Sequence, residues 1–271
     1  MTSALRSLKH RGFADRIFWV SSTIASNAEF VKELGIDEKD MYHDANNAAL
    51  KHIMDEVQKE ADDWNAYEAE LKIWKELQRA LRKHGVDNLP EDLQEKAEKA
   101  GFLDGRGAPE SKYGHKPCLH AVIDDAMGED IMSSGPRSKL VNMCIKHRHI
   151  GEGLGVSLWV CVQSWSAHGS LPRSVRENCT GACIWFTPHE KQIDLMANEL
   201  ADRSGADAFK AAYKLGTQGD HDFLFINKPA KNTPGFYNRG WNHPLGAEIS
   251  RLLASTDGEL ASAACSNERS S

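Results

Sequence analysis

The chain has 271 residues, of which 41% are hydrophobic and 27% charged, and its formal net charge is −6. This balance is ordinary for a soluble globular protein, and the negative charge argues against a protein that coats nucleic acid through a broadly basic surface. No stretch approaches the ~18 consecutive apolar residues of a membrane span, and the first residues lack the apolar core and cleavage site of a signal peptide. Six cysteines, several of them in apolar runs, indicate a reducing compartment.

The first hundred residues predict a short mixed opening and then a long helical region. We expect a helix over Thr2–Lys9, a buried strand over Arg16–Ser22 and a short helix over Glu29–Leu34 that Ser26 or Asn27 caps. Apolar residues then recur at three- and four-residue steps, which predicts a helical insertion at about 44–100. Its helical runs are expected around 50–57, 71–81 and 91–100.

The rest of the chain alternates strands with helices, which predicts an α/β fold with a mainly parallel sheet. The expected strands are CLHAVIDD, VSLWVCVQS, GACIWFT and HDFLFIN, and the expected helices cover 138–146, 188–202 and 207–214. We predict one domain over residues 1–253. The Ser/Ala-rich residues 254–271 are predicted to be a disordered tail.

Two adjacent carboxylates, Asp124 and Asp125, end one predicted strand, and Gln163 ends the next. Ligands in open α/β sheets bind beyond the carboxyl ends of the strands, so we expect these three side chains to converge there. In such a pair the first carboxylate holds Mg²⁺, usually through water, and the second orients or deprotonates the attacking water. A glutamine on the adjacent strand can sense the γ-phosphate or position that water. The alternative is that the two aspartates only begin a loop.

Arg173 and Arg176, within LPRSVRENC, are candidates for an arginine that reaches into the nucleotide site of a neighbouring subunit. The plainer alternative is a solvated loop arginine or an ion pair with Glu177. The pair Cys179 and Cys183 has the spacing of half a metal site, but no second pair lies near it.

Lys146, Arg148 and His149 form a compact basic loop, predicted at the opposite end of the sheet from Asp124. Such a loop can contact DNA phosphate. The commoner explanation is a basic helix terminus that complements the helix dipole.

Taken together, VIDDAM, KHRHIGEGLGVSLWVCVQSW and LPRSVRENC resemble the poxvirus-type DNA-packaging ATPases of large eukaryotic DNA viruses. These are P-loop NTPases of the FtsK/HerA superfamily, and the resemblance covers about Leu5–Pro244. It implies a RecA/ASCE-like fold, ATP and Mg²⁺ as cofactors, and a homo-oligomeric ring that translocates double-stranded viral DNA into the capsid, with capsid or portal proteins as partners. It also implies a location in the host cytoplasm, in a viral factory or on the virion.

The resemblance assigns roles residue by residue. It makes Asp124 the Mg²⁺ ligand, Asp125 the catalytic carboxylate and Gln163 the polar sensor. Either Arg173 or Arg176 becomes the arginine finger.

The departure from the family is the phosphate loop G-x-x-x-x-G-K-[ST], which the sequence lacks, since it contains no Gly-Lys dipeptide. In the family a strand like RIFWVSS follows the helix of that loop. We therefore expect an incomplete gene product, from a truncated gene or a start codon placed too late, that has no ATPase activity alone. Loss of the strand before the loop is expected to leave two strand edges unpaired.

Three other functions stay open. One is a bacterial or plasmid DNA-pumping ATPase of the conjugation or chromosome-translocation type. Another is a non-hydrolysing relative that folds stably and acts as a scaffold or interaction subunit. The third is a metal nuclease built on Asp124 and Asp125, with Glu129 and Asp130 as further acids.

Overall fold

The computed structural model describes residues 2–24, 28–85, 88–135, 138–201, 203–230 and 234–254. The chain divides into two compact units, Met1–Val162 and Gln163–Ser271, where the sequence predicted one domain. The predicted caps Ser26 and Asn27 and the predicted tail, apart from residue 254, lie outside the described residues. Within those ranges no helix has the length and apolar character that a membrane crossing requires.

The first unit is built on a four-stranded parallel sheet, so the predicted α/β class is confirmed for this unit. The strand order is β2–β1–β3–β4. In register, Val20 lies beside Ile123 and Ile123 beside Val160, so the carboxyl ends of three strands are level. The strands are β1 (Arg16–Val20), β2 (Met41–Tyr42), β3 (Leu119–Ile123) and β4 (Ser157–Val160).

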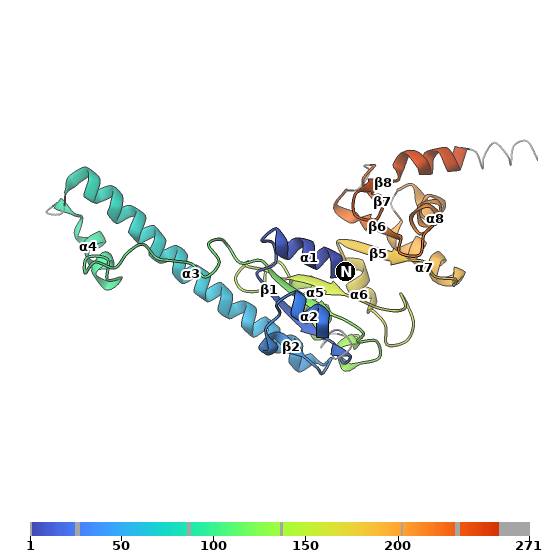
Figure 1. The fold of residues 1–271 in the computed structure, drawn as a ribbon, viewed down its shortest axis with the longest axis horizontal. Helices are drawn as coiled ribbons and strands as arrows, with labels where there is room; N and C mark the ends of the chain where they lie inside the picture. Colours follow the sequence, from blue (N-terminus) through green and yellow to red (C-terminus); the bar gives the residue numbers. More distant parts are fainter. Residues whose placement is uncertain are drawn as a thin grey trace, which may run out of the picture. The chain divides into compact units, whose positions relative to one another are not determined.

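Helices flank this sheet because its strands are apolar on both faces (Figure 1). On one face, α1 (Thr2–His10) and α2 (Ala28–Glu33) bury Leu5 and Val31 against Ile17, Trp19 and Val122. Arg16 and Phe18 alternate onto the other face, where Arg16 bonds to α3 (Asn47–His84). The helix α3 in turn contacts α5 (Lys139–Lys146).

Strand β4 is shorter than the predicted strand 156–164. Ser157 is exposed and the other three residues are only half-buried, whereas all five residues of β3 are buried. The difference follows from position, because β4 is the outer strand and pairs only with β3 among the described residues.

The predicted helical insertion is present, but its first two runs form one helix. Helix α3 is 38 residues long, about 57 Å at 1.5 Å per residue, and it contains neither glycine nor proline. The Asn46 side chain caps it by accepting hydrogen bonds from the N–H groups of Ala48 and Ala49. Figure 1 shows α3 extending well past the sheet, with α4 (Glu91–Lys99) beside its far end, where Leu77, Ala97 and Phe102 form a small apolar cluster.

The second unit contains an antiparallel sheet, so the prediction of parallel strands is wrong here. Its order is β5–β6–β7–β8. Two helices, α7 and α8, connect β5 to β6. A single connecting helix brings the chain back to the edge of the sheet where the first strand began, and the next strand then runs parallel to it. Two connecting helices bring the chain back to the edge where the first strand ended, so the next strand runs antiparallel.

The elements of the second unit are α6 (Arg173–Asn178), β5 (Gly181–Trp185), α7 (Glu190–Leu200), α8 (Gly205–Gly216), β6 (Phe223–Asn227), β7 (Tyr237–Arg239), β8 (His243–Pro244) and a helix over residues 246–254. Short 3₁₀ turns among the described residues include Glu38–Asp40, Asp130–Met132 and Lys228–Ala230. In the second unit one face of the sheet packs on α7 and α8 through Leu224, Ile226 and Phe209.

The other face of the second sheet carries aromatic rings. The rings of Phe223 and Phe225 lie 5.1 and 5.0 Å from that of Trp241, and Trp185 lies 5.2 Å from Phe223.

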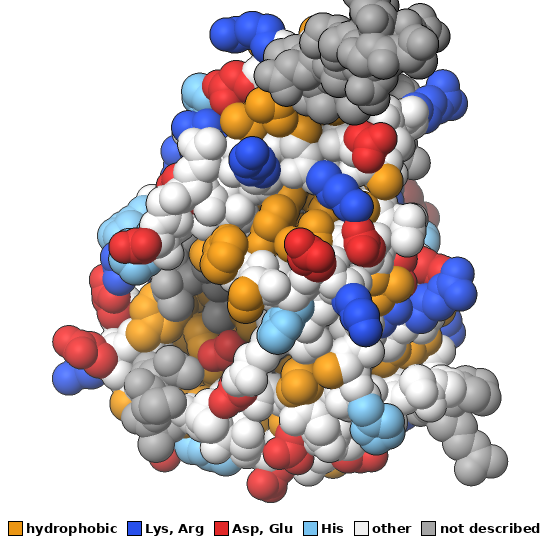
Figure 2. All heavy atoms as spheres, turned by 90° about the vertical axis from the view of Figure 1, so that its right-hand side faces the viewer, with side chains coloured by type: hydrophobic (Ala, Val, Ile, Leu, Met, Phe, Trp, Pro, Cys, Tyr) orange, Lys and Arg blue, Asp and Glu red, His pale blue; other side chains and the backbone are white. Residues whose placement is uncertain are grey.

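Figure 2 views one face of the molecule, where apolar side chains lie in patches among charged side chains of both signs. That face is therefore mixed in charge rather than basic.

A buried ion-pair network at the start of β1, the Arg16 network, joins the sheet to its neighbours. The Arg16 guanidinium bonds to Asp40 at 2.6 Å, Glu56 at 2.8 Å and Glu60 at 3.0 Å. Lys112 also pairs with Glu60. The hydrogen bond from Arg16 lowers the pKa of Glu56, so the stability that Glu56 contributes is present above its usual pKa and is lost as the pH falls through the lower native value.

Replacing Arg16 by methionine should lower the free energy of unfolding by about 3–5 kcal/mol, because it leaves charged partners buried without a counter-ion. The side chains of Asp40 and Glu60 are only 3% and 4% exposed. Arg6→Met is the matched control, since Arg6 and Glu33 are about half exposed and such pairs contribute about 1 kcal/mol or less. Urea unfolding measures both, and equal losses would contradict a dominant role for Arg16.

Candidate functional site

The candidate site lies at the carboxyl end of the parallel sheet. The N–H of Asp124 donates to the carbonyl of Val20 at 2.9 Å, which continues the pairing of β1 with β3 by one residue. The chain that leaves β1 at Ser21 is therefore held beside the chain that leaves β3 at Asp124. We call Ser21, Ser22, Thr23, Asp124 and Asp125 the hydroxyl–carboxylate site.

Hydrogen bonds tie the two segments of this site together. The Thr23 hydroxyl donates to the Asp125 carboxylate at 3.2 Å, and the Ser22 hydroxyl donates to the Asp125 carbonyl at 3.4 Å. The Oγ atoms of Ser21 and Thr23 are 3.2 Å apart. Asp125 has a φ of 50°, a left-handed conformation that aspartate tolerates better than most residues. The chain thus turns sharply after Asp124, with the Asp125 carboxylate hydrogen-bonded to Thr23.

The site has the electrostatics of a cation-binding site. Burial raises the pKa of Asp124, and the neighbouring charge of Asp125 raises it further. Asp124 is half-buried and Asp125 is exposed. A divalent cation would relieve both costs, and carboxylate with hydroxyl oxygens is a donor set that suits Mg²⁺. The residues present therefore fit Mg²⁺.

Sequence reasoning found the two carboxylates but missed the hydroxyls. Ser21 is completely buried and accepts a hydrogen bond from the N–H of Thr23 at 3.2 Å. RIFWVSS contained the signal, because it is a buried strand that ends in consecutive polar residues, as the strand before Asp124 does. Polar residues at the carboxyl end of a strand in an open α/β sheet are candidates for a ligand site. What the rule could not supply was that β1 and β3 are neighbours.

Of the other residues predicted near the carboxylates, Gln163 follows β4 and is the first residue of the second unit, whereas the hydroxyl–carboxylate site is made of first-unit residues. The Asp130 carboxylate accepts from the backbone N–H and the side chain of Asn47 at the start of α3. It therefore supports the helix, which weakens the nuclease alternative.

The structure separates the two candidate arginines. Arg176 is only 12% exposed and forms a two-pronged ion pair with Glu199 at 2.8 Å, while also donating to the carbonyl of Leu171. Its ring contact with Trp165, which itself donates to Glu199, completes a closed cluster. Arg173 is 79% exposed and bonds to Glu177 one helical turn away. Arg176 therefore supports its own unit, and Arg173 is the one accessible to a neighbour.

The basic loop lies where the sequence predicted it. Lys146 ends α5, and the residues that follow lead into the start of β4, at the opposite end of the sheet from Asp124. Lys146, Arg148 and His149 are all exposed. Both explanations remain compatible with this placement, because a last-turn lysine complements the helix dipole and an exposed basic cluster can also contact phosphate.

Comparisons with protein-family models, with curated proteins and with solved structures found no match to this chain. Its function is therefore argued from the site geometry and from the motifs in its own sequence.

Asp124→Asn should stabilise the chain in Mg²⁺-free buffer at neutral pH. The raised pKa of Asp124 means that its charge costs folding free energy, so removing the charge should recover part of that cost. We expect a gain of about 0.5–2 kcal/mol, the range common for single stabilising substitutions. Urea unfolding measures it.

Millimolar MgCl₂ should raise the melting temperature of the wild type but not of Asp124→Asn. Asp104→Asn, at an exposed loop position, is the matched control and should behave as wild type. If Asp124→Asn is less stable than the wild type and its melting temperature still rises with Mg²⁺, Asp124 is not a ligand of the cation.

Proposed function

We propose that this chain supplies the hydrolytic carboxylates of a P-loop-type ATPase that translocates double-stranded DNA, of the viral genome-packaging kind. One observation carries the proposal: an adjacent carboxylate pair follows a central parallel strand, beside the hydroxyls that end its neighbour. Mg²⁺–nucleotide chemistry needs oxygen ligands at that edge of a parallel sheet.

Each residue of the site has a role in the proposed reaction. Asp124 holds Mg²⁺, directly or through water, and the hydroxyls of the neighbouring segment orient the waters around it. Asp125 orients the attacking water and accepts its proton, and its exposure leaves it accessible to that water. Arg173 is the candidate to reach the nucleotide of an adjacent subunit. When bound, Mg²⁺ neutralises charge on the β- and γ-phosphates.

The proposal requires a phosphate-binding loop from outside these 271 residues. It also requires strand edges at which the strand before that loop can pair. Both β4 and β5 are outer strands of their sheets, each with one pairing partner within the described ranges. The incomplete burial of β4, where Leu158, Trp159 and Val160 are all partly exposed, supports such an open edge.

A second candidate is a non-hydrolysing relative that acts as an interaction subunit. The observation that favours it is the absence of G-x-x-x-x-G-K-[ST] from the sequence, because no other backbone cradle for the phosphates is recognisable there. This candidate predicts stable folding without nucleotide binding, whereas the leading one predicts ATP binding and turnover when a phosphate loop is present.

The 271-residue chain alone should release no phosphate from ATP above background, with or without duplex DNA. A longer chain that includes a phosphate loop should hydrolyse ATP. In that longer chain Asp125→Asn should lower kcat by about 10²–10⁴-fold, the contribution typical of a general base, while leaving ATP binding intact. Asparagine also tolerates the positive φ at this position, so the fold should survive.

Asp104→Asn serves as the matched control in the same assay. Turnover by the short chain, or normal kcat for Asp125→Asn, would contradict the proposed hydrolytic role. A longer chain that folds stably but does not bind ATP would favour the interaction subunit.

The basic loop should contribute to DNA binding through phosphate contacts. Replacing Lys146 and Arg148 with alanine should weaken binding to a short duplex and reduce the slope of log K against log salt by about 1.8, since each phosphate contact contributes about 0.9. Fluorescence anisotropy at several salt concentrations measures the slope. The Arg82→Ala, Lys83→Ala pair removes the same charge from the exposed last turn of α3. If the two double variants have equal slopes, the effect comes from the loss of net charge and not from phosphate contacts of the basic loop.

A further inference from the structure

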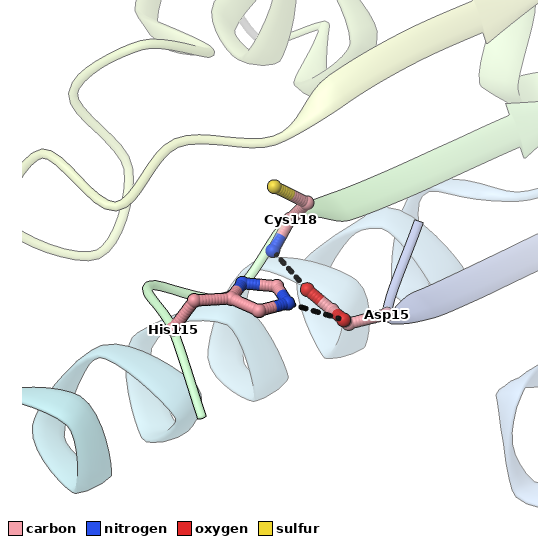
Figure 3. Close-up of side chains that lie close together, drawn as sticks. All are labelled: Asp15, His115 and Cys118. Carbon is pink, nitrogen blue, oxygen red and sulfur yellow. Dashed lines mark hydrogen bonds and ion pairs between the residues drawn. The ribbon is translucent and has the colours of Figure 1, made fainter. Parts of the chain in front are cut away.

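A second group of ligating side chains lies at the other end of the sheet, where β1 and β3 begin. Asp15 directly precedes β1, Cys118 directly precedes β3, and His115 lies in the loop that leads to Cys118 (Figure 3). One carboxylate oxygen, one imidazole nitrogen and the thiol sulfur lie within 4.8 Å of one another. Neither the proposed ATPase nor the sequence motifs use these three residues.

Backbone hydrogen bonds orient the carboxylate of this group. Asp15 Oδ2 accepts the N–H of Cys118 at 2.7 Å, and the N–H of Asp15 donates to the carbonyl of Cys118 at 2.9 Å. These two bonds place the starts of β1 and β3 side by side. The second carboxylate oxygen, Oδ1, is directed towards His115, as Figure 3 shows.

The imidazole of His115 faces that oxygen with its Nε2 atom. Its Nδ1 lies 3.0 Å from the carbonyl of Lys116, and a carbonyl can only accept, so Nδ1 carries the hydrogen. In the neutral ring Nε2 is then an acceptor, and it lies 3.4 Å from Asp15 Oδ1, which is also an acceptor. A metal ion bound by both atoms would turn this contact between two acceptors into a favourable one.

The Cys118 thiol is the third ligating group of this cluster. Burial raises the pKa of this thiol, and the charge of Asp15 raises it further. A metal that binds the thiolate reverses this, because ligation deprotonates the thiol. Nδ1–H donation to a carbonyl is also the usual way in which a ligating histidine is oriented.

We propose that Asp15, His115 and Cys118 form a zinc site that clamps the starts of β1 and β3. Sulfur, nitrogen and carboxylate oxygen together suit Zn²⁺, whereas Mg²⁺ and Ca²⁺ take oxygen ligands. Ligand atoms in a tetrahedral zinc site are about 3.3–3.8 Å apart for bonds of about 2.0–2.3 Å. Closing the site therefore takes side-chain shifts of about 1 Å. The side chain of His115 is 47% exposed, so it has room to move and water can take the fourth position.

The test is zinc binding by the whole chain, reduced and stripped with chelator. The wild type should bind one equivalent of Zn²⁺ against a competing chromophoric chelator, and excess Mg²⁺ should not displace it. His115→Ala and Cys118→Ser should each weaken binding at least about tenfold. Substitution with Co²⁺ should give a near-ultraviolet sulfur-to-cobalt charge-transfer band that Cys118→Ser abolishes.

Matched controls come from elsewhere in the first unit. Cys144→Ser in α5 and His84→Ala at the end of α3 should bind Zn²⁺ as the wild type does. Zn²⁺ should raise the melting temperature of wild type and controls but not of His115→Ala, whose exposed loop position makes a folding defect easy to separate from a binding defect. Absence of zinc binding by the wild type would overturn the proposal. Unchanged affinity in both site variants would overturn it as well.

Discussion

The structure of the first unit depends on one partly buried arginine. Arg16 begins β1, the strand that lies between β2 and β3, and its guanidinium is shared by Asp40 just before β2 and by Glu56 and Glu60 of α3. A charge at that depth is tolerated only with such partners, so the arginine fixes which segments surround it. It thereby sets the position of β1 against α3, and with it the level at which β1 ends. The hydroxyl–carboxylate site forms where that end meets the end of β3.

The same two strands carry different chemistry at their two ends. At the carboxyl end, carboxylate and hydroxyl oxygens gather, a set that suits a hard cation. At the amino end, Asp15, His115 and Cys118 offer oxygen, nitrogen and sulfur, a set that suits zinc. Both groups arise because β1 and β3 are parallel and in register, so that residues 103 positions apart, such as Asp15 and Cys118, become neighbours. One pair of strands thus organises both sites.

The second unit has its own central arginine. Arg176 joins α6, α7 and the segment around Trp165 through Glu199, in the same way that Arg16 joins the parts of the first unit. Both arginines therefore have a structural role within their own units. An arginine close to a candidate site in the sequence need not be catalytic. Spacing in the sequence treats Arg173 and Arg176 alike. Their burial distinguishes them, since a guanidinium enclosed by its own unit has no reach towards a neighbour.

Sequence alone determined the local features of this protein. Apolar runs located β1 and β3, helical periodicity located the long arm, and the polar residues after an apolar strand located Asp124 and Asp125, because each of these depends only on neighbours along the chain. Only the tertiary structure decided that Ser21–Thr23 join Asp125, that Asp15 meets His115 and Cys118, and that the second sheet is antiparallel. Those facts depend on which strands pair and in which direction, and pairing is fixed by contacts between distant residues that no local pattern encodes.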